Sequence, residues 1–171
     1  NGSTPGGFDV IALYDNASMA TLASDVGATG LGAIDGCDLT YASASSTWIL
    51  ALAENDAAGD NISIWSSTDL TSWTKSYEAS AANSVVSDIS KISVTAPNGI
   101  SDVWVAVDNS TDNTGFQLYH SDDSSSSSLQ QVYTLAADLG GIVHKGGSAG
   151  SGVIGIATEN SNAGAINFFY E

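Results

Sequence analysis

The chain repeats one pattern three times, and this repetition constrains the fold more than any other feature of the sequence. In each copy an apolar run ends in an acidic residue and an Asn, and a short polar loop leads to a second run that ends in an aromatic residue. The copies span 48–65, 103–119 and 153–170. The Asn residues at 55, 109 and 160 are 54 and 51 residues apart (109 − 55 and 160 − 109). Two apolar runs joined by a short loop predict a β-hairpin, so we expect three related hairpins.

Further apolar runs flank these hairpins at matching places. Runs at 37–42, 89–95 and 141–145 precede the three hairpins, and runs at 73–78 and 129–135 follow the first two. Four strands per period of about 40–50 residues are typical of a propeller blade. The sequence therefore predicts an all-β single domain, 1–171, of propeller-like repeats, each a four-stranded antiparallel sheet, over 31–79, 87–136 and 140–171. A β-sandwich built from the same hairpins is the alternative.

The third repeat lacks its fourth strand, whereas one extra apolar run, at 8–14, precedes the first repeat. Propellers commonly place an N-terminal strand in the last blade, so we expect 8–14 to close the third sheet beside 165–170. Three blades are fewer than the four to eight that close a ring. The chain is therefore either a piece of a longer protein or a subunit that exchanges strands with other copies. Helical spacing of apolar residues is confined to 17–26.

The charge composition excludes several classes of function. The chain has 19 acidic residues and 3 lysines, with no arginine and a net charge of -16. It has no basic patch to neutralise phosphates, which excludes nucleic-acid binding, and its sign repels anionic lipids. No apolar run approaches the ~20 residues that span a bilayer, so no membrane insertion is expected.

The uncharged composition also bears on location. Few basic residues with abundant Ser, Ala, Gly, Thr and Asn are common in exported appendages, virion parts and halophilic proteins, so we expect an extracellular, cell-surface or virion-surface protein. The start without Met suggests processing or truncation. The single Cys37 cannot form an intrachain disulfide. Three Asn-x-Ser/Thr sequences make Asn16, Asn61 and Asn109 candidate glycosylation sites.

One turn resembles a corner of known propeller families. The run from Ser67 to Trp73, with Asp69 in third place, is similar to the Ser-x-Asp-Leu-x-x-Trp corner of five-bladed glycosidases of the invertase and arabinanase type, and to a shortened Asp-box of sialidase-like propellers. The resemblance implies that the Asp accepts backbone N–H bonds in the turn and that the Trp packs between sheets. At the matching place of the second repeat Ser121 is followed by two Asp residues but no Trp. The resemblance implies a fold and brings no catalytic motif.

Three acids are the candidates for catalysis. Glu54, Asp108 and Glu159 recur at equivalent strand ends, and a ring would gather them on one face, as a glycosidase with two carboxylates requires. The structural interpretation is that each acid caps its hairpin loop by accepting backbone N–H bonds. We favour this interpretation because the acid recurs in every repeat, whereas the two members of a catalytic pair are usually unequal. The sequence therefore leans toward a protein that is not an enzyme.

Two acidic loops offer the hard oxygen ligands that calcium prefers. The carboxylates are Glu54, Asp56, Asp60, Asp108 and Asp112. Their spacing does not match an EF-hand, so solvated acidic turns are favoured, and no cofactor is predicted apart from this calcium alternative. His120 and His144 have no Cys or His partner at zinc spacing.

The aromatic residues are the better lead to a ligand, because exposed rings beside Asn and Asp hold neutral sugars. Alternation places Trp65 on the face of Ser63, opposite Ile62 and Ile64, so we predict that Trp65 and Tyr119 face a ligand or an interface. The competing interpretation is that the rings fill the space between sheets. The sequence thus favours a non-enzymatic structural or recognition protein that forms homo-oligomers or polymers and binds glycans. A fragment of a propeller-type glycoside hydrolase is the alternative.

Overall fold

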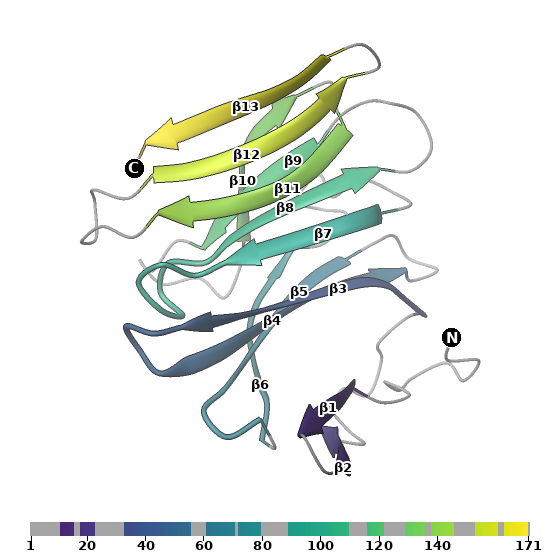
Figure 1. Cartoon of the computed structure of the whole chain (residues 1–171), viewed down its shortest axis with the longest axis vertical. Helices are drawn as coiled ribbons and strands as arrows, with labels where there is room; N and C mark the ends of the chain where they lie inside the picture. Colours follow the sequence, from purple (N-terminus) through teal and green to yellow (C-terminus); the bar gives the residue numbers. More distant parts are fainter. Residues whose placement is uncertain are drawn as a thin grey trace.

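A computed structural model describes residues 11–15, 18–22, 33–55, 61–70, 72–79, 89–109, 116–121, 129–135, 138–145, 153–160 and 163–170. Every regular element in these ranges is a β-strand, so the prediction of an all-β chain is confirmed (Figure 1). None of these ranges contains a helix long and apolar enough to cross a membrane.

The strands form three successive meanders in which spatial order follows chain order. Sheet 1 contains β3 (Ala33–Ala42), β4 (Thr47–Asn55), β5 (Asn61–Ser67) and β6 (Thr74–Ala79). Sheet 2 contains β7 (Ile89–Thr95), β8 (Trp104–Asn109), β9 (Phe116–Ser121) and β10 (Leu129–Leu135). Sheet 3 contains β11 (Asp138–Lys145), β12 (Val153–Asn160) and β13 (Ala163–Tyr170). All neighbouring strands are antiparallel, so the predicted four-stranded antiparallel sheets are confirmed for sheets 1 and 2.

The main core lies between sheets 1 and 2. Ile49, Ile62 and Ile64 of sheet 1 share one buried cluster with Val105 and Tyr119 of sheet 2. The opposite face of sheet 2 is also buried, in a second cluster that reaches sheet 3: Trp104, Ala106, Phe116, Leu118 and Ile156. Burial on both faces explains why 103–107 is a continuous apolar run rather than an alternating one.

The first strands of sheets 1 and 2 lie side by side and are joined by a side chain. Asp38 of β3 accepts hydrogen bonds from the Val94 N–H (2.8 Å) and the Ser93 hydroxyl (3.2 Å) of β7 through Oδ2. Oδ1 of the same carboxylate accepts the Leu39 N–H at 2.9 Å. Since β7 is the edge of sheet 2, Asp38 pairs an N–H that would otherwise stand open at that edge.

The N-terminal strands form a separate ribbon. β1 (Ile11–Asp15) pairs with β2 (Ser18–Leu22), with Asp15 opposite Ser18. Among the described strands β13 pairs with β12 alone, and β1 lies at the other end of the molecule from β13 (Figure 1). The prediction that 8–14 closes sheet 3 within its own chain is therefore wrong for 11–14, because closing a local hairpin costs far less chain entropy than pairing with a strand about 150 residues away. Residues 8–10 lie outside the described ranges, and the helical spacing at 17–26 gives a strand at 18–22.

The turn that follows β5 is closed by its own side chains. The Ser67 hydroxyl accepts the N–H groups of Leu70 (2.8 Å) and Asp69 (3.3 Å) and donates to Asp69 Oδ1 (3.1 Å). Asp69 Oδ1 also accepts the Ser72 N–H at 2.8 Å. The prediction that Asp69 accepts backbone N–H bonds in this turn is confirmed, and the resemblance to propeller families itself stays a prediction.

Candidate functional site

The two rings predicted to face a ligand are both buried. Trp65 is 5% exposed, and its indole N–H donates to the Ser63 hydroxyl at 3.0 Å. The face shared with Ser63 is therefore as predicted, but Ser63 is itself 0% exposed. Tyr119 is 0% exposed, its hydroxyl lies 2.6 Å from Gln117 Oε1, and burial raises the pKa of its phenol. The predicted exposed position is wrong for both rings, because each polar atom finds a partner two residues away and the ring can then be buried.

The three candidate catalytic acids take equivalent backbone positions. Glu54, Asp108 and Glu159 are the penultimate residues of β4, β8 and β12. The side chain of Asp108 is 4% exposed, and its Oδ2 lies 3.8 Å from the ammonium nitrogen of Lys91. The side chains of Glu54 and Glu159 lie outside the described part of the structure, so a catalytic role for this set stays a prediction.

The calcium and glycosylation predictions fall largely outside the described ranges. Asp56, Asp60, Asp112 and Asn16 are not described, nor is the side chain of Asn109. Asn61 begins β5 and is partly buried. Among the residues that the structure describes, no group of three or more His, Cys, Asp or Glu side chains is placed to hold a metal ion. Both predictions remain open.

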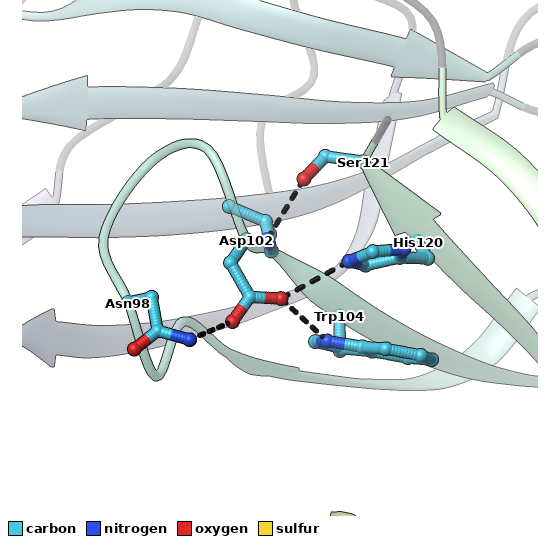
Figure 2. A network of polar contacts seen from close by, with 6 residues as sticks. Asn98, Asp102, Trp104, His120 and Ser121 are labelled. Carbon is cyan, nitrogen blue, oxygen red and sulfur yellow. Dashed lines mark hydrogen bonds and ion pairs between the residues drawn. The ribbon is translucent and has the colours of Figure 1, made fainter. Parts of the chain in front are cut away.

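The most connected polar cluster is centred on Asp102, in the connection between β7 and β8. Asp102 Oδ1 accepts hydrogen bonds from the indole N–H of Trp104 (2.8 Å) and from Nε2 of His120 (3.0 Å). Its Oδ2 accepts a bond from the amide of Asn98 at 2.7 Å. Figure 2 shows these side chains converging on the one carboxylate. Asp102 is only 6% exposed, so its charge is held by these donors rather than by bulk water.

Strand register explains how this cluster is assembled. Trp104 of β8 and His120 of β9 are opposite each other, so their side chains share a face, and the two rings stack with centroids 4.0 Å apart. Asp102 is two residues before Trp104, on the same side of the extended chain. Ser121, next to His120, points elsewhere, and its hydroxyl accepts the Val103 N–H at 2.8 Å.

A glycine turn brings the fourth member into place. Asp102 donates its backbone N–H to the Gly99 carbonyl (3.1 Å), and Gly99 donates to the Ala96 carbonyl (3.4 Å). Gly99 has a φ of 96°, in the left-handed region that glycine adopts readily. This turn sets Asn98 beside the carboxylate of Asp102.

Burial and hydrogen bonding have opposite effects on the pKa of Asp102. Burial alone would raise the pKa of the carboxyl group. The hydrogen bonds from His120, Trp104 and Asn98 outweigh burial and hold the pKa of Asp102 below its ordinary value of 3.8. The carboxylate is therefore ionised at neutral pH.

A carboxylate that orients an imidazole is part of catalytic triads and of many metal-ligating histidines. Here the hydroxyl next to the ring in sequence, that of Ser121, is 0% exposed and is already bonded to a backbone N–H. The arrangement therefore holds β8, β9 and the 96–102 turn together. It does not present a nucleophile from Ser121.

The sequence alone does not predict this cluster. It does not single out Asp102, and it presents His120 only as a histidine without a Cys or His partner at zinc spacing. In both Ser63-x-Trp65 and Asp102-x-Trp104 the indole bonds to the residue two positions earlier. In these two places the polar residue two positions before the Trp accepts the buried indole N–H, whereas Trp48, two positions after Ser46, is half-buried.

A second feature is an exposed aromatic pair at the β3–β4 turn. Tyr41 is 48% exposed and lies opposite Trp48 in the register of the two strands. Their ring centroids are 4.8 Å apart with an interplanar angle of 51°. The turn between them, residues 43–46, is exposed throughout.

Comparison with protein-family models and with curated proteins finds no match to this chain.

Proposed function

We propose that this chain is a non-enzymatic protein of the cell exterior or a virion surface that assembles with copies of itself and recognises glycans. The observation that supports self-assembly is the incomplete third sheet. Sheets 1 and 2 have four strands each, whereas sheet 3 has three, and β13 pairs with a strand on one side alone within the described ranges. The unpaired side of β13 stands where the fourth strand lies in the other two sheets.

The composition of the outer strands favours strand addition at β13. β6, the outer strand of sheet 1, carries the ion pair between Lys75 and Glu78 at 2.8 Å. β13 (Ala-Gly-Ala-Ile-Asn-Phe-Phe-Tyr) has neither a charged residue nor a proline. Edge strands are normally protected from pairing by charges, proline or bulges. An unprotected edge is suited to a strand from a second copy, which joins copies head to tail.

The described carboxylates favour a structural rather than a catalytic use of acids. Asp38 joins β3 to β7, Asp69 closes a turn, and Asp102 holds two rings and an amide. Each accepts hydrogen bonds that fix the framework. The scarcity of basic residues and the polar uncharged composition are typical of exported proteins, which supports the proposed location.

Light scattering coupled to size exclusion, over a range of protein concentrations, tests self-assembly. We expect masses above 17.3 kDa that rise with concentration. Asn167→Lys places a charge in β13 and should shift the protein toward the monomer, while Asn167→Gln should leave assembly unchanged. A wild-type protein that stays monomeric would refute self-assembly. Hydrolysis of an aryl glycoside, lost in Glu54→Gln, would establish the glycosidase alternative instead.

A further inference from the structure

We propose that Tyr41 and Trp48, together with the serine-rich turn between them, bind the apolar face of a neutral sugar. This inference rests on the glycan-recognition part of the proposed function and names its site and its ligand class. It does not depend on self-assembly.

The aromatic pair is both accessible and fixed in place. Tyr41 is the most exposed ring among the described residues, at 48%, and Trp48 is half-buried. The next residue pair on the same face is Leu39 with Leu50, and Leu50 is 2% exposed, so the rings stand on a packed base. A ring that is already ordered loses little conformational entropy when a ligand binds, which favours recognition.

The chemistry of the rings suits a sugar. The face of an aromatic ring is electron-rich, and the C–H groups on one face of a pyranose are weakly positive. Because the two rings are tilted by 51°, they offer two differently oriented surfaces rather than one flat stack.

Hydroxyl groups lie in the turn that joins the strands of the two rings. Ser43, Ser45 and Ser46 are exposed in the turn between the two rings. The turn is held by the Ser45 N–H bonded to the Ala42 carbonyl (3.2 Å) and by the Thr47 hydroxyl bonded to the Ser45 carbonyl (3.0 Å). A hydroxyl both donates and accepts, so these groups match the hydroxyl rim of a sugar.

The adjacent turn of sheet 2 supports this rim. A Cβ added at Gly99 would lie 2.7 Å from the Ser45 hydroxyl oxygen, so the 96–102 connection packs directly against Ser45. The serine turn is therefore supported at Ser45 from outside its own hairpin.

Charge narrows the ligand class to neutral sugars. No residue from 39 to 50 is charged, and the whole chain carries -16. A sialylated or sulfated glycan would meet no cation within 39–50 and would be repelled by the net charge of the protein. The site should therefore prefer neutral hexoses or N-acetylhexosamines to their anionic derivatives.

Saturation-transfer NMR with lactose, cellobiose and N,N′-diacetylchitobiose tests the proposal, with 3′-sialyllactose as the anionic counterpart. We expect transfer from aromatic protein protons to the C–H protons of at least one neutral sugar, and weaker transfer to sialyllactose. Tyr41→Ala should weaken that binding about tenfold, and Tyr41→Phe should retain it, because stacking needs the ring and not the phenol. Tyr133→Ala is the matched control, since Tyr133 is 38% exposed on β10 in sheet 2.

Absence of transfer to all three neutral sugars would overturn the proposal, as would equal binding by wild type and Tyr41→Ala. Circular dichroism and thermal unfolding of each variant establish that the fold is kept, and Tyr41→Phe covers the case in which the alanine variant does not fold. Light scattering on Tyr41→Ala separates the two proposals. If Tyr41→Ala has a lower mass than the wild type, and the wild type binds none of the sugars, then Tyr41 and Trp48 form a contact between copies. That result would overturn the sugar site and would leave self-assembly in place.

Discussion

Replacing Asp102 by alanine should destabilise the fold by about 3 kcal/mol. A hydrogen bond to a charged group contributes roughly 1.5–3 kcal/mol, and a buried donor left without a partner loses most of that amount. The indole N–H of Trp104 is such a donor, because Trp104 is only 9% exposed. His120 has a side chain that is 27% exposed, and Asn98 is partly buried, so both can recover hydrogen bonds to water, and we assign them about 0.5 kcal/mol each.

The stabilisation by Asp102 should also depend on pH, in a direction that its pKa predicts. The pKa of Asp102 is lower in the folded protein than its ordinary value of 3.8, so the folded state favours the ionised form. The stabilisation by Asp102 is therefore complete above about pH 4 and is lost as the pH falls through the folded pKa. The difference in unfolding free energy between wild type and Asp102→Ala should be largest near neutral pH and should shrink in acid.

Urea unfolding followed by tryptophan fluorescence, at neutral pH and in acid, measures both quantities. Asp102→Asn keeps one acceptor oxygen and should lose about half as much stability as Asp102→Ala. Glu78→Ala is the matched control, because the Lys75–Glu78 pair is exposed (39% and 43%) and surface ion pairs contribute about 0–1 kcal/mol. A loss below about 1 kcal/mol for Asp102→Ala, or a difference that grows in acid, would refute this account of the cluster.

Two further predictions concern the contacts between sheets 1 and 2. Gly99→Ala should destabilise the protein by about 1–3 kcal/mol, because alanine tolerates a φ of 96° poorly and because its Cβ would meet the Ser45 hydroxyl. Replacing Ser45 by glycine in the same protein should relieve only the contact with the hydroxyl. Thermal unfolding of the single and double variants measures both effects. Asp38→Ala should lower the free energy of unfolding by about 2 kcal/mol and should speed hydrogen exchange at the Val94 amide, with Asp38→Asn intermediate in both. An unchanged exchange rate at Val94 would count against the hydrogen bond between the sheets.

The strands and their order could be predicted because hairpin pairing is local. The apolar runs, the short loops and the recurring acid–Asn pair placed the strands of all three sheets to within a few residues. The continuous apolar run at 103–107 fits the burial of sheet 2 on both faces, which the structure shows. Local turn chemistry was equally readable, since the hydroxyl and carboxylate of Ser67 and Asp69 bond within their own turn.

What covers each face could not be predicted in this way. Alternation placed Trp65 beside Ser63, and a serine on that face looked like a sign of solvent. The structure shows instead that the Ser63 hydroxyl accepts the indole N–H, so the pair is buried together. The partner of 11–14 was missed for a related reason, because several strands could accept it and the choice depends on closure entropy rather than on residue type.

The sequence by itself determined the all-β class, the two complete meanders and the strongly negative net charge of -16. The tertiary structure alone decided which polar groups hold the framework and which rings meet solvent. Asp102 and His120 are 18 residues apart and become a cluster through the register of β8 and β9 and the turn before them. The periodicity of a sequence predicts the side of a strand on which a residue lies. The neighbouring sheet or turn decides whether that side is buried or exposed to solvent. A buried side chain can only stabilise the fold, whereas an exposed one can bind a ligand.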